Sequence, residues 1–155
     1  MTTWCAKLLA GLCFVVSLTA PAQAANEKGS ADEAMAMTKK AVAFYKANGA
    51  EKAFAEFNKP DGQFRDRDLY IFVYDKAGTV LSIGSNPKLI GKNLIDMKDV
   101  DGKPIIKGFV DLAFGPAGKG WVDYKWPNPV SKAVEPKSSY IERAGDVLIG
   151  CGIYK

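Results

Sequence analysis

Apolar residues in the first third of the chain repeat at helical spacing. Ser30-Ala31-Asp32-Glu33 forms a capping box, in which the Ser30 hydroxyl caps the first turn and Glu33 reaches back. We expect a helix from there to about Ala47, ended by Asn48-Gly49, because both of these residues tolerate a positive φ. A short second helix follows, with Ala53, Phe54 and Phe57 facing inward. The buried stripe of the first helix comprises Ala34, Met37, Ala41, Phe44 and Tyr45.

The pattern then changes to strands. Residues 69–74 and 79–83 read as a hairpin around the turn 75–78, and residues 105–114 read as a helix. Three more strands are expected over residues 120–126, 134–142 and 146–154. This order predicts an α+β domain of PAS-like layout, with an antiparallel sheet of about five strands and a long N-terminal helix over one face.

The N-terminus has the features of a secretory signal peptide. Lys7 precedes an apolar run over residues 8–20, and Ala22-Gln23-Ala24 provides a small-x-small cleavage site. The run is shorter than the roughly 20 residues needed to span a bilayer. We therefore expect residues 1–24 to be cleaved after Ala24, and residues 25–155 to be a single periplasmic or secreted domain.

Charge and composition exclude several classes of function. The formal net charge is +4, with the charges interspersed, so no basic stripe for nucleic acid is visible. The chain has no histidine, which excludes Ser-His-Asp and Cys-His catalysis and histidine metal sites. Cys5 and Cys13 lie in the expected signal peptide, so Cys151 has no intramolecular partner for a disulfide. We expect no cofactor and no metal.

Aromatic residues alternate along the strand 120–126. Val122, Tyr124 and Trp126 share one face, which we expect to point inward. The following strand offers Lys137 and Tyr140. Gly150 and Gly152 on the last strand leave space over the sheet. Two interpretations remain open: these aromatic residues are ordinary core, or they line a pocket for a small anionic ligand.

Two charged segments have simpler interpretations. Asp99-Val100-Asp101-Gly102 lacks the first Asp and the final Glu of a calcium loop, so we expect a tight turn. Residues 65–68 read as a solvated loop of compensating charges. Asp99 and Asp101 could in principle act as acid and base. No nucleophile–base pair is evident, however, so we expect a protein that is not an enzyme.

The ordered motifs resemble the single Cache domain family, in its second type. The resemblance rests on Tyr70 with Asp75 and Gly78, Gly91-Lys92-Asn93, Asp101-Gly102, Gly120-x-x-x-Tyr124-x-Trp126-x-x-Pro129, Lys137-x-x-Tyr140 and Gly152-x-Tyr154. It implies an extracytoplasmic sensor domain with a pocket on the sheet, often for short carboxylates or amino acids. By that resemblance Lys137 neutralises a carboxylate, Tyr124 and Tyr140 orient it, and Trp126 walls the pocket. Phe72 and Gly152 complete the candidate ligand-binding residues.

The resemblance also implies how such a protein would act. Related domains usually sit between two membrane helices, whereas we expect a cleaved leader here and see the chain end at Lys155. We therefore expect a periplasmic sensor-type domain that acts through a separate membrane receptor, with a homodimer through the N-terminal helix as a further option. The alternative is an accessory protein of a receptor or redox complex whose core is filled and binds no ligand.

Overall fold

The computed structural model describes residues 28–155, so the expected signal peptide lies outside the described part. The described helices are α1 (Ala31–Asn48), α2 (Ala50–Phe57), the short 3₁₀ helix η1 (Pro87–Leu89) and α3 (Ile106–Phe114). The strands are β1 (Arg65–Asp66), β2 (Leu69–Asp75), β3 (Val80–Ile83), β4 (Lys119–Pro127), β5 (Val134–Ala144) and β6 (Val147–Tyr154).

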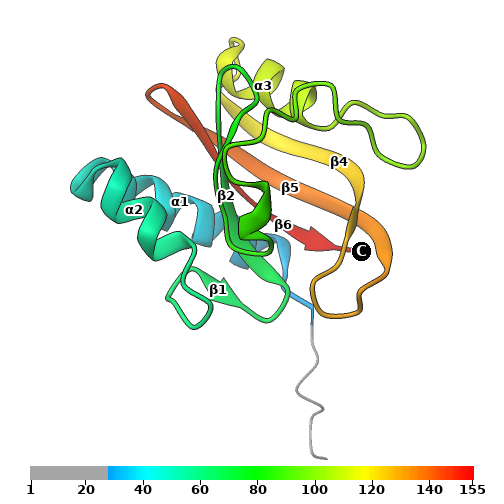
Figure 1. Cartoon of the computed structure of the whole chain (residues 1–155), viewed down its shortest axis with the longest axis horizontal. Coiled ribbons are helices and arrows are strands. Elements are labelled where there is room, and N and C mark those ends of the chain that lie inside the picture. The colour runs from blue at the N-terminus through cyan, green and yellow to red at the C-terminus, as the bar shows by residue number, and fades with distance from the viewer. Residues whose placement is uncertain (1–27) are drawn as a thin grey trace, which may run out of the picture.

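These six described strands form one antiparallel sheet in the order β1-β2-β6-β5-β4, with β3 also pairing with β2. The last strand along the chain therefore lies in the middle, between β2 and β5. In Figure 1, α1 and α2 lie on one side of the sheet, while α3 and the segment that carries η1 lie on the other. The buried strands therefore lie between two covering layers, an arrangement that an α+β fold allows.

The side chains of β2 alternate between two cores. Leu69, Ile71 and Val73 pack with α1 and α2 in the first core. Tyr70 and Phe72, with Tyr74 beyond them, pack with α3 in the second core. Successive side chains of a strand point to opposite faces, so β2 is buried on both sides. The second core contains most of the aromatic residues that matter for the candidate site.

The capping box at the start of α1 forms as expected. The Ser30 Oγ accepts from the Glu33 N–H, and a Glu33 carboxylate oxygen accepts from the Ser30 N–H at 2.7 Å. Gly49 ends the helix with φ 80°, and its N–H donates to the Tyr45 carbonyl. The predicted helices and the five predicted strands are confirmed, with bounds shifted by one or two residues.

The segment 65–68 differs from the expectation of a solvated loop. Arg65 and Asp66 form the two-residue strand β1, which the sequence pattern did not reveal. Asp68 is buried, and its Oδ1 accepts from the Gly29 N–H at 2.7 Å. This carboxylate therefore fastens the start of α1 to the beginning of β2, instead of being compensated in solvent by the neighbouring arginines.

Candidate functional site

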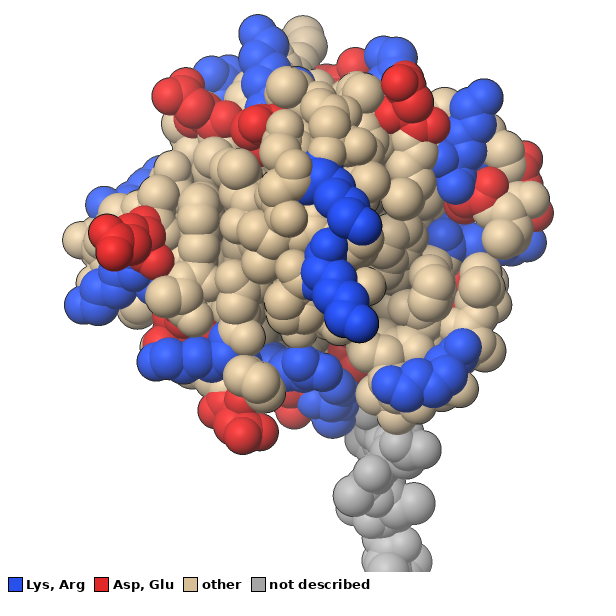
Figure 2. Space-filling model, in the orientation of Figure 1, with Lys and Arg blue, Asp and Glu red and all other residues tan. Residues whose placement is uncertain are grey.

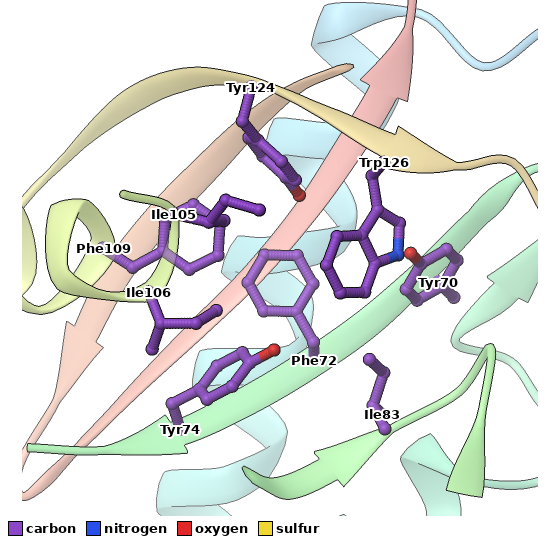
Figure 3. Close-up of a pocket in the computed structure, with 9 residues that line it drawn as sticks. All are labelled: Tyr70, Phe72, Tyr74, Ile83, Ile105, Ile106, Phe109, Tyr124 and Trp126. Carbon is purple, nitrogen blue, oxygen red and sulfur yellow. The ribbon is translucent and has the colours of Figure 1, made fainter. Parts of the chain in front are cut away.

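A small aromatic cavity lies between the sheet and α3. Phe72 stacks on Phe109 with ring centroids 5.4 Å apart, and Tyr124 meets Phe109 edge-on at 5.2 Å. Figure 3 shows Trp126 at one end of the cavity, beside Tyr70, and the α3 side chains at the other. The cavity is lined by Tyr70, Phe72, Tyr74, Ile83, Ile105, Ile106, Phe109, Tyr124 and Trp126. Its free volume is about 10 Å³, which is room for about one water molecule.

Lys137 adjoins this cavity through Tyr70. Its side chain is 1% exposed, and its Nζ donates to the hydroxyl oxygens of Tyr70 at 2.8 Å and Tyr154 at 3.2 Å. The same nitrogen lies 4.0 Å and 4.4 Å from the centroids of those two rings. Tyr154 in turn donates its hydroxyl to the Pro127 carbonyl at 2.8 Å. Two phenols from two different strands therefore hold one ammonium group.

No carboxylate pairs with Lys137 anywhere in residues 28–155. An ammonium group has three N–H donors, and the two tyrosines use two of them. Burying a charge without a counter-charge is costly, so such groups are normally paired. The Lys137 side chain is therefore a buried cation with one unused N–H and no acidic partner among the described residues.

The phenols of this site titrate differently because of that cation. Burial by itself raises the pKa of Tyr70, but the charge of the Lys137 ammonium and its hydrogen bond lower the pKa below its ordinary value. Burial raises the pKa of Tyr124, Tyr74 and Tyr154. Tyr70 is thus the phenol most strongly influenced by Lys137.

The two glycines of β6 make room for large side chains. A Cβ on Gly152 would lie 2.0 Å from the Ser139 Oγ and 2.6 Å from the Lys137 Cε. A Cβ on Gly150 would lie 2.6 Å from the Phe72 ring. The expected space over these glycines is therefore occupied by side chains of the site, and Gly152 acts by admitting Lys137.

The structure brings together most of the residues that the sequence singled out. Phe72, Tyr124 and Trp126 line the cavity, and Lys137 adjoins it. The Tyr124 hydroxyl is hydrogen-bonded to the Ser139 Oγ at 2.8 Å, so the partner that it needs when buried is a serine. Whether any of these residues contacts a ligand stays a prediction.

Tyr140 is not part of this constellation. It pairs across the strands with Trp121, and the two rings lie 5.4 Å apart. Lys137 and Tyr140 are three positions apart on β5, and an odd separation on a strand puts two side chains on opposite faces. The expectation that Tyr140 would orient a ligand beside Lys137 is corrected by this geometry.

Sequence reasoning missed two central residues of the site, Tyr70 and Tyr154, as partners of Lys137. Tyr154 shares a face with Gly152 by alternation, and Tyr70 shares a face with Phe72. The sequence alone could therefore show which face of its strand each of these tyrosines occupies. It could not show the order of the strands, which sets β6 between β2 and β5.

The segment 99–103 is a hydrogen-bonded turn. Asp99 Oδ1 accepts from the N–H groups of Asp101 and Lys103, and its Oδ2 accepts from the Lys125 N–H. Within residues 28–155, no group of three or more acidic, cysteine or histidine side chains is arranged to hold a metal ion. The Asp99 carboxylate therefore organises the backbone between β3 and α3.

Cys151 is the free cysteine of the described residues. Burial raises the pKa of the Cys151 thiol to about 12. This thiol is buried and unbridged, so it lacks the thiolate character that reactive cysteines have.

Among the helices that the structure describes, none combines the length and the apolar character needed to cross a membrane.

Comparisons with known proteins show what the chain is similar to. A family model described as Single Cache domain 2 matches residues 15–155. The methyl-accepting chemotaxis protein McpP of Pseudomonas putida is 32% identical over 91 residues, which are 57% of this chain and 16% of McpP. The sensor histidine kinase MctS of Rhizobium johnstonii is 30% identical over 90 residues, which are 57% of this chain and 19% of MctS. The chain thus matches less than a fifth of the length of these curated relatives.

Solved structures share the fold. A methyl-accepting chemotaxis protein from Vibrio parahaemolyticus superposes with a TM-score of 0.69 at 30% identity, covering 79% of this chain and 86% of that one. A Cache chemosensory domain that recognises carboxylic acids gives a TM-score of 0.67 at 24% identity, covering 79% and 91%. The periplasmic sensor domain of a chemotaxis protein gives 0.60 at 26% identity, covering 79% and 88%.

Proposed function

Since the chain belongs to the single Cache domain 2 family, we propose that it is a sensor-type domain that binds a small organic anion through Lys137. The observation that carries this proposal is the buried ammonium of Lys137, which has no acidic partner among the described residues. A ligand carboxylate would supply the missing counter-charge and accept the remaining N–H. Charge-assisted hydrogen bonds of this kind contribute about 1.5–3 kcal/mol each.

The hydroxyl groups beside Lys137 complete the proposed anion site. Tyr70 and Tyr154 already accept from the ammonium. The Tyr70 hydroxyl can donate a hydrogen bond to a carboxylate oxygen, whereas the Tyr154 hydroxyl already donates to the Pro127 carbonyl. The apolar part of the ligand would lie against Phe72 and Trp126 in the aromatic cavity. In this proposal Lys137 neutralises the carboxylate, Tyr70 orients it, and the aromatic side chains of the cavity limit the size of the ligand.

The cavity favours a plain, short carboxylate over an amino acid. None of its lining residues carries an acidic side chain that could pair with an α-ammonium group. Its free volume of about 10 Å³ leaves little space beyond the existing side chains. Carboxylic acid recognition in the structurally similar chemosensory domain supports the same class of ligand.

Thermal unfolding of the purified protein with propionate, acetate and alanine tests this proposal. A ligand at one hundred times its Kd adds about 2.7 kcal/mol to the unfolding free energy, which is a rise of roughly 5–15 °C in Tm for a domain of this size. We expect propionate and acetate to produce the shift, and alanine to produce little.

The variant Lys137→Met removes the charge while keeping most of the side-chain volume. Loss of one charge-assisted hydrogen bond should weaken carboxylate binding by roughly tenfold or more. Lys107→Met is the matched control, because Lys107 is exposed and paired with Asp111 on α3. Equal affinities in Lys137→Met and the wild type would show that the anion is not held at Lys137.

We further propose that the domain works outside the cytoplasm and that a membrane receptor reads its occupancy. Chemotaxis and histidine-kinase relatives support this role. A second proposal is a homodimer through α1, which sedimentation with and without propionate would detect. The receptor role has its own test. Capture of a receptor from membranes only in the presence of propionate would support the signalling role, and ligand-independent capture would oppose it.

An accessory protein with a filled core is the second candidate function. The specific observation in its favour is the small free volume of the cavity. On that hypothesis Trp126→Ala costs several kcal/mol of stability and changes no ligand affinity, because no carboxylate binds the wild type. Calorimetric titration with propionate separates the two candidates directly.

A further inference from the structure

Two cavities of very different size share a single residue. The inner aromatic cavity has a free volume of about 10 Å³, whereas a cleft beside it has about 240 Å³. One wall of the cleft is the segment Ser85, Asn86 and Leu89 around η1, and the other comprises Trp126, Pro127, Asn128, Pro129 and Lys132. Trp126 is the residue that lines both spaces.

The cleft also reaches the Lys137 site from the outside. Pro127, which lines the cleft, accepts the Tyr154 hydroxyl at 2.8 Å. Ser85, on the opposite wall, is a hydrogen-bonding neighbour of the Tyr70 side chain. The two tyrosines that hold Lys137 therefore each contact one wall of the cleft. Lys137 is linked to the inner cavity through Tyr70 and to the cleft through Tyr154 and Pro127.

The size of the inner cavity requires a moving part. Space for about one water cannot hold the four heavy atoms of acetate, so binding displaces a lining side chain. Eight of the nine lining residues are buried, whereas Trp126 is partly exposed. Trp126 is thus the lining side chain with the fewest packing constraints, and it separates the 10 Å³ cavity from the 240 Å³ cleft.

The backbone around Trp126 is held in place, which leaves the side chain as the mobile element. Asn128 is buried, its N–H donates to the Ala133 carbonyl at 2.8 Å, and its Oδ1 accepts from the Val130 N–H at 2.8 Å. The bond from Tyr154 to Pro127 fixes the next carbonyl. A hinge of the whole β4–β5 connection would strain the bond from Tyr154 to Pro127, whereas a rotation about the Trp126 side-chain torsions breaks none of these bonds.

The charges around the cleft suit an anion. Lys132 is the one charged residue among those that line it. In Figure 2, which views the molecule as in Figure 1, basic side chains lie near the middle of the face, and side chains of both signs lie around its periphery. An excess of positive potential raises the rate at which anions arrive.

We propose that the cleft between η1 and the β4–β5 connection is the route by which a small carboxylate reaches Lys137, with Trp126 as its gate. This inference rests on the proposed function, because it assumes that an anion binds beside Lys137. It adds a separate claim about kinetics: the cleft and Trp126 control how fast the anion enters and leaves, while Lys137 controls how tightly it is held.

Rates of propionate exchange test the route. We expect Leu89→Trp, which fills the cleft from the η1 wall, to slow association and dissociation together by about tenfold and leave Kd within about twofold. Pro129→Trp fills the same cleft from the other wall and should act alike, which keeps the test valid if one variant fails to fold. Val100→Trp is the control, since Val100 is 70% exposed and lines neither space.

NMR line shapes of propionate titrations supply both rates. If these variants changed Kd through the dissociation rate alone, the cleft residues would be contacting the bound ligand, and the proposed route would be overturned. Unchanged rates in both cleft-filling variants would overturn it as well. Weak binding in Lys137→Met with unchanged association in all variants would retain the proposed function while removing the gate.

The gate is also testable without a ligand. With 5-fluorotryptophan incorporated, we expect the ¹⁹F signal of Trp126 to show exchange on the microsecond-to-millisecond timescale, and that of Trp121 to show none. Trp126→Phe assigns the signal. A Trp126 resonance with neither relaxation dispersion nor a second position would overturn the gate, whatever propionate does. If propionate fails to bind the wild type, the proposed function fails. Exchange at Trp126 would then still support a moving Trp126 side chain, but not its role in admitting a small carboxylate.

Discussion

Lys137 donates to the Tyr70 hydroxyl at 2.8 Å while its nitrogen lies 4.0 Å from the centroid of the same ring. The ammonium therefore touches both the polar and the aromatic part of one tyrosine. Cation–π contacts are strongest where water is excluded, and both residues here are buried. This pairing stabilises a buried charge partly, without the acidic partner that would satisfy it fully.

The first prediction concerns the titration of Tyr70. In the wild type, the Lys137 charge holds the pKa of Tyr70 below its ordinary value although burial opposes this. Lys137→Met removes the charge and leaves the burial, so the pKa of Tyr70 rises. Absorbance of tyrosinate against pH should lose its earliest-ionising phenol in the variant. Superimposable titration curves of the two proteins would contradict the expectation, and Lys107→Met serves as control.

The second prediction concerns Gly152. A Cβ at this position meets Lys137 and Ser139 far inside contact distance. Gly152→Ala should cost about 1–3 kcal/mol of unfolding free energy, as overpacking does, and should weaken propionate binding by displacing Lys137. Chemical denaturation and calorimetric titration measure the two effects.

Gly108→Ala is the matched control for Gly152→Ala. Its Cβ would meet a Val122 methyl at an ordinary 3.7 Å. Since Gly108 lies inside α3, alanine should stabilise the helix by up to about 1 kcal/mol. An equal loss of stability in both variants would show that crowding at Lys137 is not the cause.

The third prediction is a coupling between Tyr124 and Ser139. Their hydroxyl groups are 2.8 Å apart and buried. Tyr124→Phe leaves the Ser139 hydroxyl without this partner, and Ser139→Ala does the converse, so each should cost about 1–2 kcal/mol. The double variant should cost less than the sum by roughly 1 kcal/mol. Strictly additive unfolding free energies would mean that the bond contributes nothing.

The fourth prediction concerns acid stability. Hydrogen bonds from Ser131, Lys28 and Asn128 lower the pKa of Glu135 from 4.5 to about 2. Because the folded state holds this proton less tightly than the unfolded state, the contribution of Glu135 is complete above pH 4.5 and is lost as the pH falls towards 2.

Glu135→Gln cannot lose this contribution through protonation. The variant should therefore show a smaller fall in unfolding free energy between pH 5 and about pH 2, and a lower value at neutral pH. Denaturant unfolding at a series of pH values measures both. Parallel curves for the two proteins would indicate that Glu135 is equally acidic in the unfolded chain.

Particular residues show how much of the fold and of the candidate site local sequence pattern can predict. The capping box at Ser30, the stop at Gly49 and the alternation of β4 each depend on neighbours within a few positions, so local pattern predicted them. The same alternation rule places Lys137 and Tyr140 on opposite faces. Pairing them in one pocket was an error that the sequence itself could have prevented.

Apart from the two-residue strand β1, the sequence by itself determined the order of helices and strands, their approximate bounds and the aromatic face of β4, because these follow from local periodicity. Only the tertiary structure decided which side chains meet Lys137. Tyr70 lies 67 positions away and Tyr154 lies 17 positions away. Their contact with one ammonium depends on the placing of β6 between β2 and β5. Strand order is set by the joint burial of both faces of the sheet, and no local pattern contains that information.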